Sequence, residues 1–316
     1  MSPFTKFVLF LSVSVTALAG QAAAQPFFDF DRRADLAVFR PGDSRWYTQS
    51  SESGSSDSVK WGLVSDRLVP GDFDGDGLTD HAVWRPESGI WYVFRSRDGL
   101  MQTQNWGTRQ FVPIGWLPDE PVVGDYDGDG NDDFAVWRPS TGIWYILKST
   151  DGFNPEYATT VAWGKLGDIP VPADYDGDGR ADAAIFRSTE NRWYVRRSSD
   201  ESWQTTVLGQ AGIDRLVPAD YTGDGRADFA VFRDGNWIVE SSADGSRTTT
   251  RYGISTDIPV PADYDGDGKT DRAVYRDGRW YVLNSASGVT SVIDYGLAGD
   301  IPLPSLRTRP SIVPIP

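Results

Sequence analysis

A nine-residue pattern, D-x-(D/T)-x-D-G-x-x-D, recurs five times along the chain and constrains its fold more than any other feature. The copies begin at Asp72, Asp125, Asp174, Asp220 and Asp263, so successive copies lie 53, 49, 46 and 43 residues apart. Each copy leads into a short apolar run that ends in an aromatic residue and Arg. Recurrence at about 40–50 residues is typical of β-propellers, in which each repeat supplies one blade of a closed ring.

Each repeat contains four segments that resemble short strands. Residues 169–173 precede an Asp loop, residues 134–138 follow one, residues 143–147 come after a turn, and a polar segment then ends in an aromatic residue and Gly. Pro170 and Pro172 lie two residues apart, so their missing N–H groups face the same edge. Such a strand fits the innermost position, because it pairs on one side only. The repeat therefore predicts a four-stranded blade whose Asp loop joins the first and second strands.

The number of blades follows from two residues that recur once in every unit. The second-strand arginines are Arg40, Arg85, Arg138, Arg187, Arg233 and Arg276, and the third-strand tryptophans are Trp46, Trp91, Trp144, Trp193, Trp237 and Trp280. We therefore expect an all-β, six-bladed propeller of four-stranded antiparallel blades, with seven blades as the alternative. Residues 301–304 resemble one more inner strand, and residues 27–31 resemble a clipped one. We expect the C-terminal strand to supply or complete the inner position of the first blade, which removes open sheet edges.

Each Asp loop carries oxygen ligands at a spacing that suits Ca²⁺, a hard cation that takes about six to eight oxygens. We predict that positions 1, 3, 5 and 9 offer side-chain oxygens and that position 7 offers its backbone carbonyl. The predicted ligands are Asp72, Asp74, Asp76, Leu78 and Asp80; Asp125, Asp127, Asp129, Asn131 and Asp133; Asp174, Asp176, Asp178, Arg180 and Asp182; Asp220, Thr222, Asp224, Arg226 and Asp228; and Asp263, Asp265, Asp267, Lys269 and Asp271. The alternative is a set of Asp- and Gly-rich turns without an ion. Four close carboxylates would then repel one another, so we favour structural Ca²⁺.

Three details refine the metal prediction. Thr222 replaces a carboxylate, so its site is expected to be the weakest. Asp29, Asp31 and Asp35 resemble a remnant loop that has lost two residues of spacing and its Gly-Asp-Gly part, and we expect it to bind nothing. An EF-hand is excluded, because position 12 is Val or Ile inside a β-type run, where an EF-hand needs Glu.

On these loops, of which the run from Gly71 to Gly77 is an example, the chain resembles the FG-GAP/VCBS repeat family, known from integrin α-subunit propellers and many secreted bacterial proteins. The resemblance covers roughly residues 25–306. It implies a propeller loaded with Ca²⁺. Members of the family include adhesins, lectins and non-catalytic modules of larger enzymes, so the resemblance does not fix a function.

The N-terminus is typical of a secretory signal. Lys6 supplies a positive charge, residues 7–19 are apolar but too short to span a bilayer, and three alanines precede Gln25. We predict a signal peptide at residues 1–24, with cleavage near Ala24-Gln25, then a propeller at residues 25–306 and a tail at 307–316. The mature chain is expected to be secreted, periplasmic or on the cell surface, without a membrane span. It has no cysteine, so its stability cannot come from disulfides.

The acidic balance of the chain comes mainly from the Asp loops. The formal net charge is −15, and the predicted ligand positions hold 19 of the 45 acidic residues. The other 26 acidic residues face 30 Lys and Arg, so the rest of the chain is nearly balanced. Nothing here favours a nucleic-acid partner, and we expect a monomer.

Aromatic residues outside the repeat are the candidates for ligand binding. The third-strand Trp and the aromatic residue before each second-strand Arg occur in every unit, which indicates packing between blades. The segment from Gly107 to Asp125 is longer than its counterparts and holds Phe111 and Trp116 on an expected surface loop. Trp203 also lies outside the pattern. These three residues are our candidate ligand contacts, and the alternative is that the insertion folds onto the ring and covers an edge.

Few residues favour catalysis. The sole histidine, His81, is expected to be a solvated or hydrogen-bonded surface residue, and no nucleophile or phosphate-binding motif occurs. The leading prediction is a secreted, non-catalytic, calcium-stabilised propeller that acts as a binding or adhesion module for extracellular glycan or protein. One alternative is a structural surface or matrix protein without a discrete ligand site. A third, weaker candidate is a Ca²⁺-dependent polysaccharide lyase or hydrolase.

Overall fold

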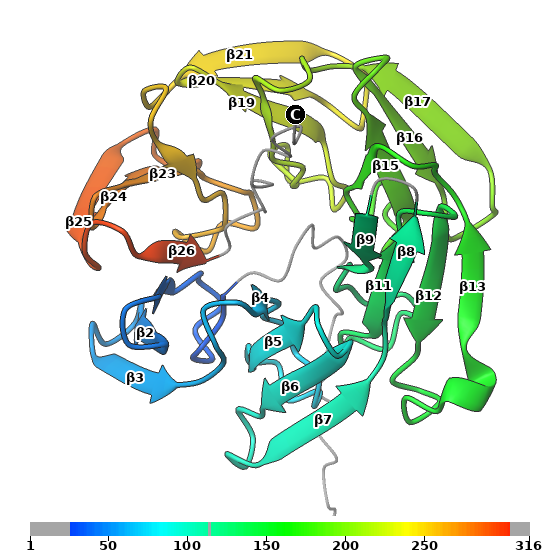
Figure 1. Ribbon diagram of the computed structural model, residues 1–316. Helices are drawn as coiled ribbons and strands as arrows, with labels where there is room; N and C mark the ends of the chain where they lie inside the picture. Colours follow the sequence, from blue (N-terminus) through cyan, green and yellow to red (C-terminus); the bar gives the residue numbers. More distant parts are fainter. Residues whose placement is uncertain (1–25, 113–114, 304–316) are drawn as a thin grey trace, which may run out of the picture.

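The computed structural model describes residues 26–112 and 115–303, and within them the chain forms six four-stranded antiparallel sheets arranged in a ring (Figure 1). This confirms the predicted six-bladed propeller. The first three blades are, from the inside outward, β26 (Ile301–Leu303), β1 (Leu36–Arg40), β2 (Arg45–Gln49) and β3 (Ser56–Lys60); β4 (Arg67–Leu68), β5 (His81–Arg85), β6 (Ile90–Phe94) and β7 (Met101–Asn105); and β10 (Glu120–Pro121), β11 (Phe134–Arg138), β12 (Ile143–Leu147) and β13 (Thr159–Ala162).

The remaining blades repeat this order. They are β14 (Asp168–Pro170), β15 (Ala183–Arg187), β16 (Arg192–Arg196) and β17 (Trp203–Val207); β18 (Arg215–Leu216), β19 (Phe229–Arg233), β20 (Asn236–Glu240) and β21 (Arg247–Arg251); and β22 (Ile258–Pro259), β23 (Arg272–Arg276), β24 (Arg279–Leu283) and β25 (Thr290–Asp294). A 3₁₀ turn, η1 (Pro155–Tyr157), precedes β13, and a separate hairpin of β8 (Arg109–Val112) and β9 (Gly115–Pro118) precedes blade 3. No helix within the described ranges is long and apolar enough to cross a membrane. The predicted signal peptide and the tail at 307–316 lie outside the described residues.

The C-terminal strand closes the ring. β26 pairs antiparallel with β1, with Val38 opposite Pro302, and so supplies the inner strand of the first blade as expected. Residues 27–31 are not a strand, so the interpretation of this segment as a clipped inner strand is wrong. The inner edge of β1 is already occupied by β26, and Phe27 instead bonds to Thr79 of the next blade, whose N–H donates to its carbonyl at 2.6 Å.

Two faces of the ring differ in what they carry. The loop face carries the Asp loops and the connections from third to fourth strand. The turn face carries the turns from second to third strand and the connections between blades. The β8–β9 hairpin belongs to the turn face, where the Ser140 hydroxyl donates to Gln110 Oε1 at 2.5 Å. The inserted segment therefore folds onto the turn of blade 3.

Hydrophobic clusters lie between the blades and not within them. Six clusters fall within the described residues, and each joins two neighbouring sheets. The third-strand tryptophans are fully buried in these clusters, which confirms their predicted role in packing. Each also donates its indole N–H to a backbone carbonyl at the end of the fourth strand, as Trp144 does to Trp163 at 2.9 Å. The tryptophan thus satisfies its one polar atom while it fills the gap between sheets.

The second-strand arginines pair with buried aspartates that the sequence reading missed. Arg138 donates through Nε and Nη2 to the two carboxylate oxygens of Asp119, both at 3.0 Å, and its guanidinium carbon lies 4.2 Å from the centre of the Tyr145 ring. Asp119 also accepts from the Thr108 N–H at 3.0 Å. The same aspartate recurs just before or at the start of every inner strand, as Asp66, Asp119, Asp168, Asp214, Asp257 and Asp300. On the turn face, each of these six pairs connects the end of a second strand to the start of an inner strand.

Candidate metal centres

The carboxylate at position 1 of each Asp loop organises the tight turn that follows it. Asp72 Oδ1 accepts from the Gly75 N–H at 2.7 Å, and Asp72 Oδ2 accepts from the Gly77 N–H at 2.8 Å. Both glycines have positive φ values, 72° and 86°, that other residues adopt only with strain. The D-x-D-G-D-G sequence therefore folds into a curl that turns its oxygens toward one point.

The carboxylate at position 9 holds the loop to the rest of its blade. Asp80 Oδ2 accepts from the Phe73 N–H at 2.9 Å, and Asp80 Oδ1 accepts from the Ser96 N–H at 2.7 Å. Ser96 lies in the connection from β6 to β7. The buried Asp80 thus joins two separate segments of the loop face.

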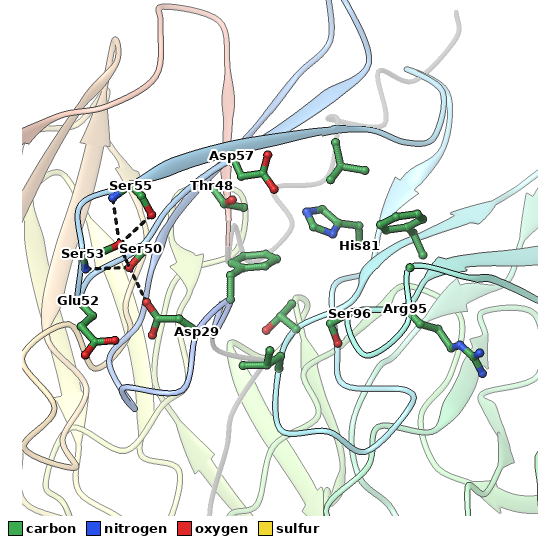
Figure 2. A pocket seen from close by; sticks show the side chains of 16 residues that line it. Asp29, Thr48, Ser50, Glu52, Ser53, Ser55, Asp57, His81, Arg95 and Ser96 are labelled. Carbon is green, nitrogen blue, oxygen red and sulfur yellow. Dashed lines mark hydrogen bonds between the residues drawn. The ribbon is translucent and has the colours of Figure 1, made fainter.

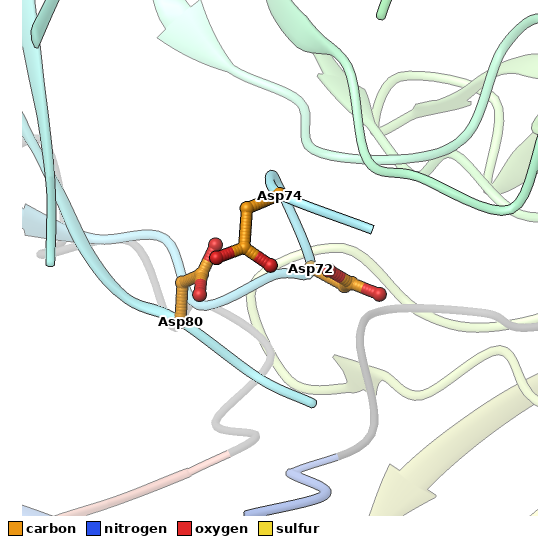
Figure 3. A group of neighbouring side chains, drawn as sticks. All are labelled: Asp72, Asp74 and Asp80. Carbon is orange, nitrogen blue, oxygen red and sulfur yellow. The ribbon is translucent and has the colours of Figure 1, made fainter. Parts of the chain in front are cut away.

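Four loops bring three carboxylates together. In each, one carboxylate oxygen from positions 1, 3 and 9 lies within 4.8 Å of the others. Figure 3 shows the triad of the blade 2 loop. The triads are Asp72, Asp74 and Asp80; Asp125, Asp127 and Asp133; Asp174, Asp176 and Asp182; and Asp263, Asp265 and Asp271. In the first of them, Asp74 Oδ1 is buried and has no hydrogen-bond partner among the described residues. An all-oxygen set with an unsatisfied carboxylate oxygen fits a hard cation such as Ca²⁺.

Burial raises the pKa of the position-9 carboxyls against the lowering effect of their backbone hydrogen bonds. The pKa rises to about 6 for Asp80 and Asp271, to about 7 for Asp182 and to about 8 for Asp133. Burial also raises the pKa of Asp72, and the charges of neighbouring aspartates add to the effect. These loops would therefore hold their negative charge at a free-energy cost that a bound cation would remove.

Positions 5 and 7 have other contacts in the structure. Asp76 Oδ1 accepts from the Leu78 N–H at 2.8 Å and from the Ser96 hydroxyl at 3.0 Å. The side chain at position 7 packs over the first glycine of the preceding loop, as Asn131 does over Gly75. That these two positions also ligate the ion stays a prediction.

The loop of blade 5 differs in composition, as the sequence indicates. Its positions 1, 3 and 9 are Asp220, Thr222 and Asp228, so only two of the three residues carry a carboxylate. The Thr222 hydroxyl lies 3.4 Å from Asp220 Oδ1, to which it donates. The expectation that this site is the weakest remains a prediction.

The loop of the first blade is complete in length, so the prediction that it had lost two residues of spacing is wrong. Asp35 Oδ2 accepts from the Phe28 N–H at 2.5 Å and Asp35 Oδ1 from the Ser51 N–H at 2.7 Å, which are the contacts of a position-9 carboxylate. Counting back from Asp35 places Phe27 at position 1. Asp29 and Asp31 therefore stand at positions 3 and 5. The loop differs from the others because Phe27 replaces the first carboxylate and because Phe30 and Arg32 replace the two glycines.

Backbone hydrogen bonds link the loops into a ring of their own. The N–H at position 8 donates to the carbonyl at position 1 of the preceding blade, as Asp132 does to Asp72 and Ala181 to Asp125, at 2.7 and 2.6 Å. The same bond joins the first and last blades, where Ala34 donates to Asp263 at 2.7 Å. The position of each loop therefore depends on its neighbours.

The three aromatic candidates lie on separate elements. Trp203 starts β17, the outermost strand of blade 4, and its side chain is 65% exposed. Phe111 and Trp116 face each other across the β8–β9 hairpin in backbone register. Of these three candidates, Trp203 supplies an exposed aromatic side chain within the described part of the chain.

His81 is buried, so the prediction that it is a surface residue is wrong. It is 9% exposed, and its ring centre lies 5.1 Å from that of Phe28 and 5.2 Å from that of Trp46. Burial lowers its pKa to about 4, so the imidazole is neutral at neutral pH. The reason is contact across the blade interface, because both aromatic neighbours belong to blade 1.

Comparison with known proteins agrees with this architecture. A family model described as FG-GAP-like repeat matches residues 72–136, 125–185 and 174–231, which together make up half of the chain. No curated protein sequence matches the chain.

Solved structures show a likeness of fold alone. TolB from Acinetobacter baumannii is 10% identical over 85% of this chain, with a TM-score of 0.56, and the chain spans 65% of that protein's length. A lectin from Agrocybe aegerita, described as recognising non-reducing terminal N-acetylglucosamine, is 16% identical over 83% of this chain and 76% of its own, with a TM-score of 0.51.

Proposed function

This chain belongs to the family of FG-GAP-like repeat proteins, and from that membership we propose that it is a secreted, non-catalytic β-propeller, stabilised by Ca²⁺, that binds extracellular glycan or protein. One observation carries the calcium part of the proposal. Four loops each gather three aspartate oxygens within 4.8 Å on one face of the ring. Bound Ca²⁺ would neutralise these carboxylates and hold each loop in its curled form.

The proposal of a non-catalytic role rests on what the acidic groups already do. Position-9 aspartates such as Asp80 brace their loops, and aspartates such as Asp119 are saturated by arginine and backbone donors. His81, the sole histidine, is enclosed by aromatic rings. Carboxylates and imidazoles held in this way are poorly placed for acid–base work. Turnover of any polysaccharide by the purified mature chain in a depolymerisation assay would refute this part.

Binding is favoured over a purely structural role because a rigid ring presents irregular features at its surface. The exposed Trp203 and the β8–β9 hairpin both depart from the repeat, and such departures on a rigid scaffold commonly carry recognition. Glycan is the first class to test, because exposed aromatic rings can stack on sugar faces. A glycan array read in Ca²⁺ should give reproducible binding that Trp203→Ala or Trp116→Ala weakens. Absence of both glycan and protein binding would favour the structural alternative.

Thermal melting tests the calcium part separately. A site filled at about one hundred times its Kd stabilises the fold by about 2.7 kcal/mol, so millimolar Ca²⁺ should raise the Tm and EGTA should lower it. Asp176→Asn removes the position-3 carboxylate from a triad and should reduce this gain. Asp29→Asn is the matched control, because it occupies position 3 of the loop that has Phe27 at position 1. An equal Tm in Ca²⁺ and EGTA would refute structural calcium.

A further inference from the structure

A recess of about 430 Å³ opens on the loop face between blades 1 and 2. One wall comes from β2, β3 and their connection in blade 1, and the other comes from β5, β6 and the segment after β6 in blade 2 (Figure 2). The recess lies beside the one loop that has Phe27 at position 1, where the repeat is most altered. Its volume falls within the range of about 300–1,000 Å³ that is typical of small-ligand sites.

His81 lines this recess and carries one unsatisfied polar atom. It opens β5 at a position that other blades fill with Leu36, Phe134, Ala183, Phe229 or Arg272. Its Nε2 atom is buried and has no hydrogen-bond partner within the described part of the chain. A buried polar atom without a partner has a desolvation cost, because it has lost its hydrogen bonds to water. A ligand hydroxyl that reached Nε2 would remove this cost.

Hydroxyl groups form much of the opposite wall. Ser53 Oγ lies 2.9 Å from Ser50 Oγ and 2.8 Å from Ser55 Oγ, and Ser50 donates to Asp29 Oδ2 at 2.6 Å. Figure 2 shows this chain of hydrogen bonds facing His81 and Ser96 across the recess. Because hydroxyls both donate and accept, such a wall suits a ligand that itself carries several hydroxyls.

The charged and aromatic side chains that line the recess further restrict the class of ligand that it could bind. Asp29, Glu52 and Asp57 line the recess, while Arg95 is the one basic side chain among the described lining residues and is already paired with Asp98. An anionic ligand would therefore be repelled. The rings of Phe28 and Phe94 offer apolar contact to the C–H face of a sugar.

We propose that this recess binds one neutral or amino-bearing sugar unit, with His81 Nε2 and the serine wall bonding to its hydroxyls. This inference rests on the proposed binding function and adds to it a monosaccharide site that is separate from the exposed aromatic residues. The site is independent of the β8–β9 hairpin, which belongs to the opposite face, and of Trp203 on blade 4.

Calorimetric titration of the mature chain in Ca²⁺ tests the proposal. The probes are free glucose, galactose and mannose with their 2-amino and uronic acid counterparts. At least one neutral or amino sugar should bind with a Kd of about 1 mM or below, and the corresponding uronic acid should bind at least tenfold more weakly. His81→Phe should weaken binding at least tenfold and keep its Tm, because phenylalanine stands at the equivalent positions 134 and 229. Ser53→Ala, in the β2–β3 connection, should weaken binding severalfold, and Trp203→Ala should leave it unchanged.

The proposal is overturned if no sugar of the panel binds, if the uronic acids bind as tightly as the neutral sugars, or if both His81→Phe and Ser53→Ala bind like the wild type. The glycan array distinguishes failure of this sugar-site proposal from failure of the proposed binding function. Array binding that survives in His81→Phe would place glycan recognition elsewhere on the ring. If the wild type bound neither glycan nor protein, both this proposal and the proposed binding function would be refuted.

Discussion

Removal of one arginine from the turn face should destabilise the ring strongly, and Arg138→Met is the sharpest case. Asp119, its partner, has a fully buried side chain, and the pair makes two hydrogen bonds of 3.0 Å. Methionine keeps most of the length of the side chain but cannot donate. Asp119 would then retain one backbone donor, from Thr108, for a buried negative charge.

The expected loss is about 3–5 kcal/mol, the usual cost of breaking a buried ion pair by removing one partner. The unpaired carboxylate can lose its charge by taking up a proton. For an aspartate of ordinary acidity, this protonation costs about 4 kcal/mol at pH 7 and about 1.5 kcal/mol at pH 5. Loss of the contact between Arg138 and the Tyr145 ring adds about 0.5–1 kcal/mol at either pH. The destabilisation should therefore be clearly smaller at pH 5 than at pH 7.

Urea unfolding of the Ca²⁺-loaded protein at both pH values measures this effect. Arg279→Met is the matched control, because its partner Asp294 is exposed and solvent screens an ion pair of this kind. A variant in which Asp119→Asn is added to Arg138→Met should recover part of the loss, because no charge remains buried. Equal effects of Arg138→Met and Arg279→Met, or a loss that does not depend on pH, would refute the reasoning.

Three further predictions concern the loops, the turns and the closure of the ring. Because burial raises the pKa of Asp133 to about 8 in the folded chain, above its value in the unfolded chain, EGTA-treated protein should lose stability as the pH rises from about 5 to 8. The Tm gain from Ca²⁺, followed by circular dichroism, should therefore grow over the same range, and a constant gain would contradict this. Gly142→Ala should cost about 3 kcal/mol in urea unfolding, because the new Cβ would lie 2.2 Å from a backbone oxygen, whereas Gly152→Ala, with a similar positive φ and no described atom within 4 Å, should cost about 1 kcal/mol. A chain that ends at residue 299 lacks β26 and should self-associate in light scattering, because the inner edge of β1 is open.

The ring and its acidic triads could be predicted because their signals are local. Each loop carries its own carboxylates and glycines within nine residues, and Pro170 marks the inner strand without reference to any distant residue. The recurring second-strand arginines and third-strand tryptophans then give the number of blades. Short-range patterns of this kind determine local structure directly.

The remaining features depend on neighbours that the sequence does not place. The aspartate of each turn-face pair lies 19 residues before its arginine in most blades, and only the fold brings Asp119 to Arg138. The recurring Asp before each inner strand was nevertheless a signal that could have been read. The register of the first loop could not be recognised from the sequence, because Phe27 replaces its first carboxylate and Arg32, with a positive φ of 66°, replaces its second glycine. Burial of His81 follows from aromatic rings on another blade.

Closure of the ring by β26 has a consequence for the order of folding. Arg40 and Asp300 are 260 residues apart in sequence, while the other turn-face pairs join residues of the same repeat. Bringing such distant segments together has a large entropic cost, and contacts of long sequence separation slow folding. During synthesis, blades 2–6 can assemble as their residues emerge. The first blade to be made should therefore be the last to be completed.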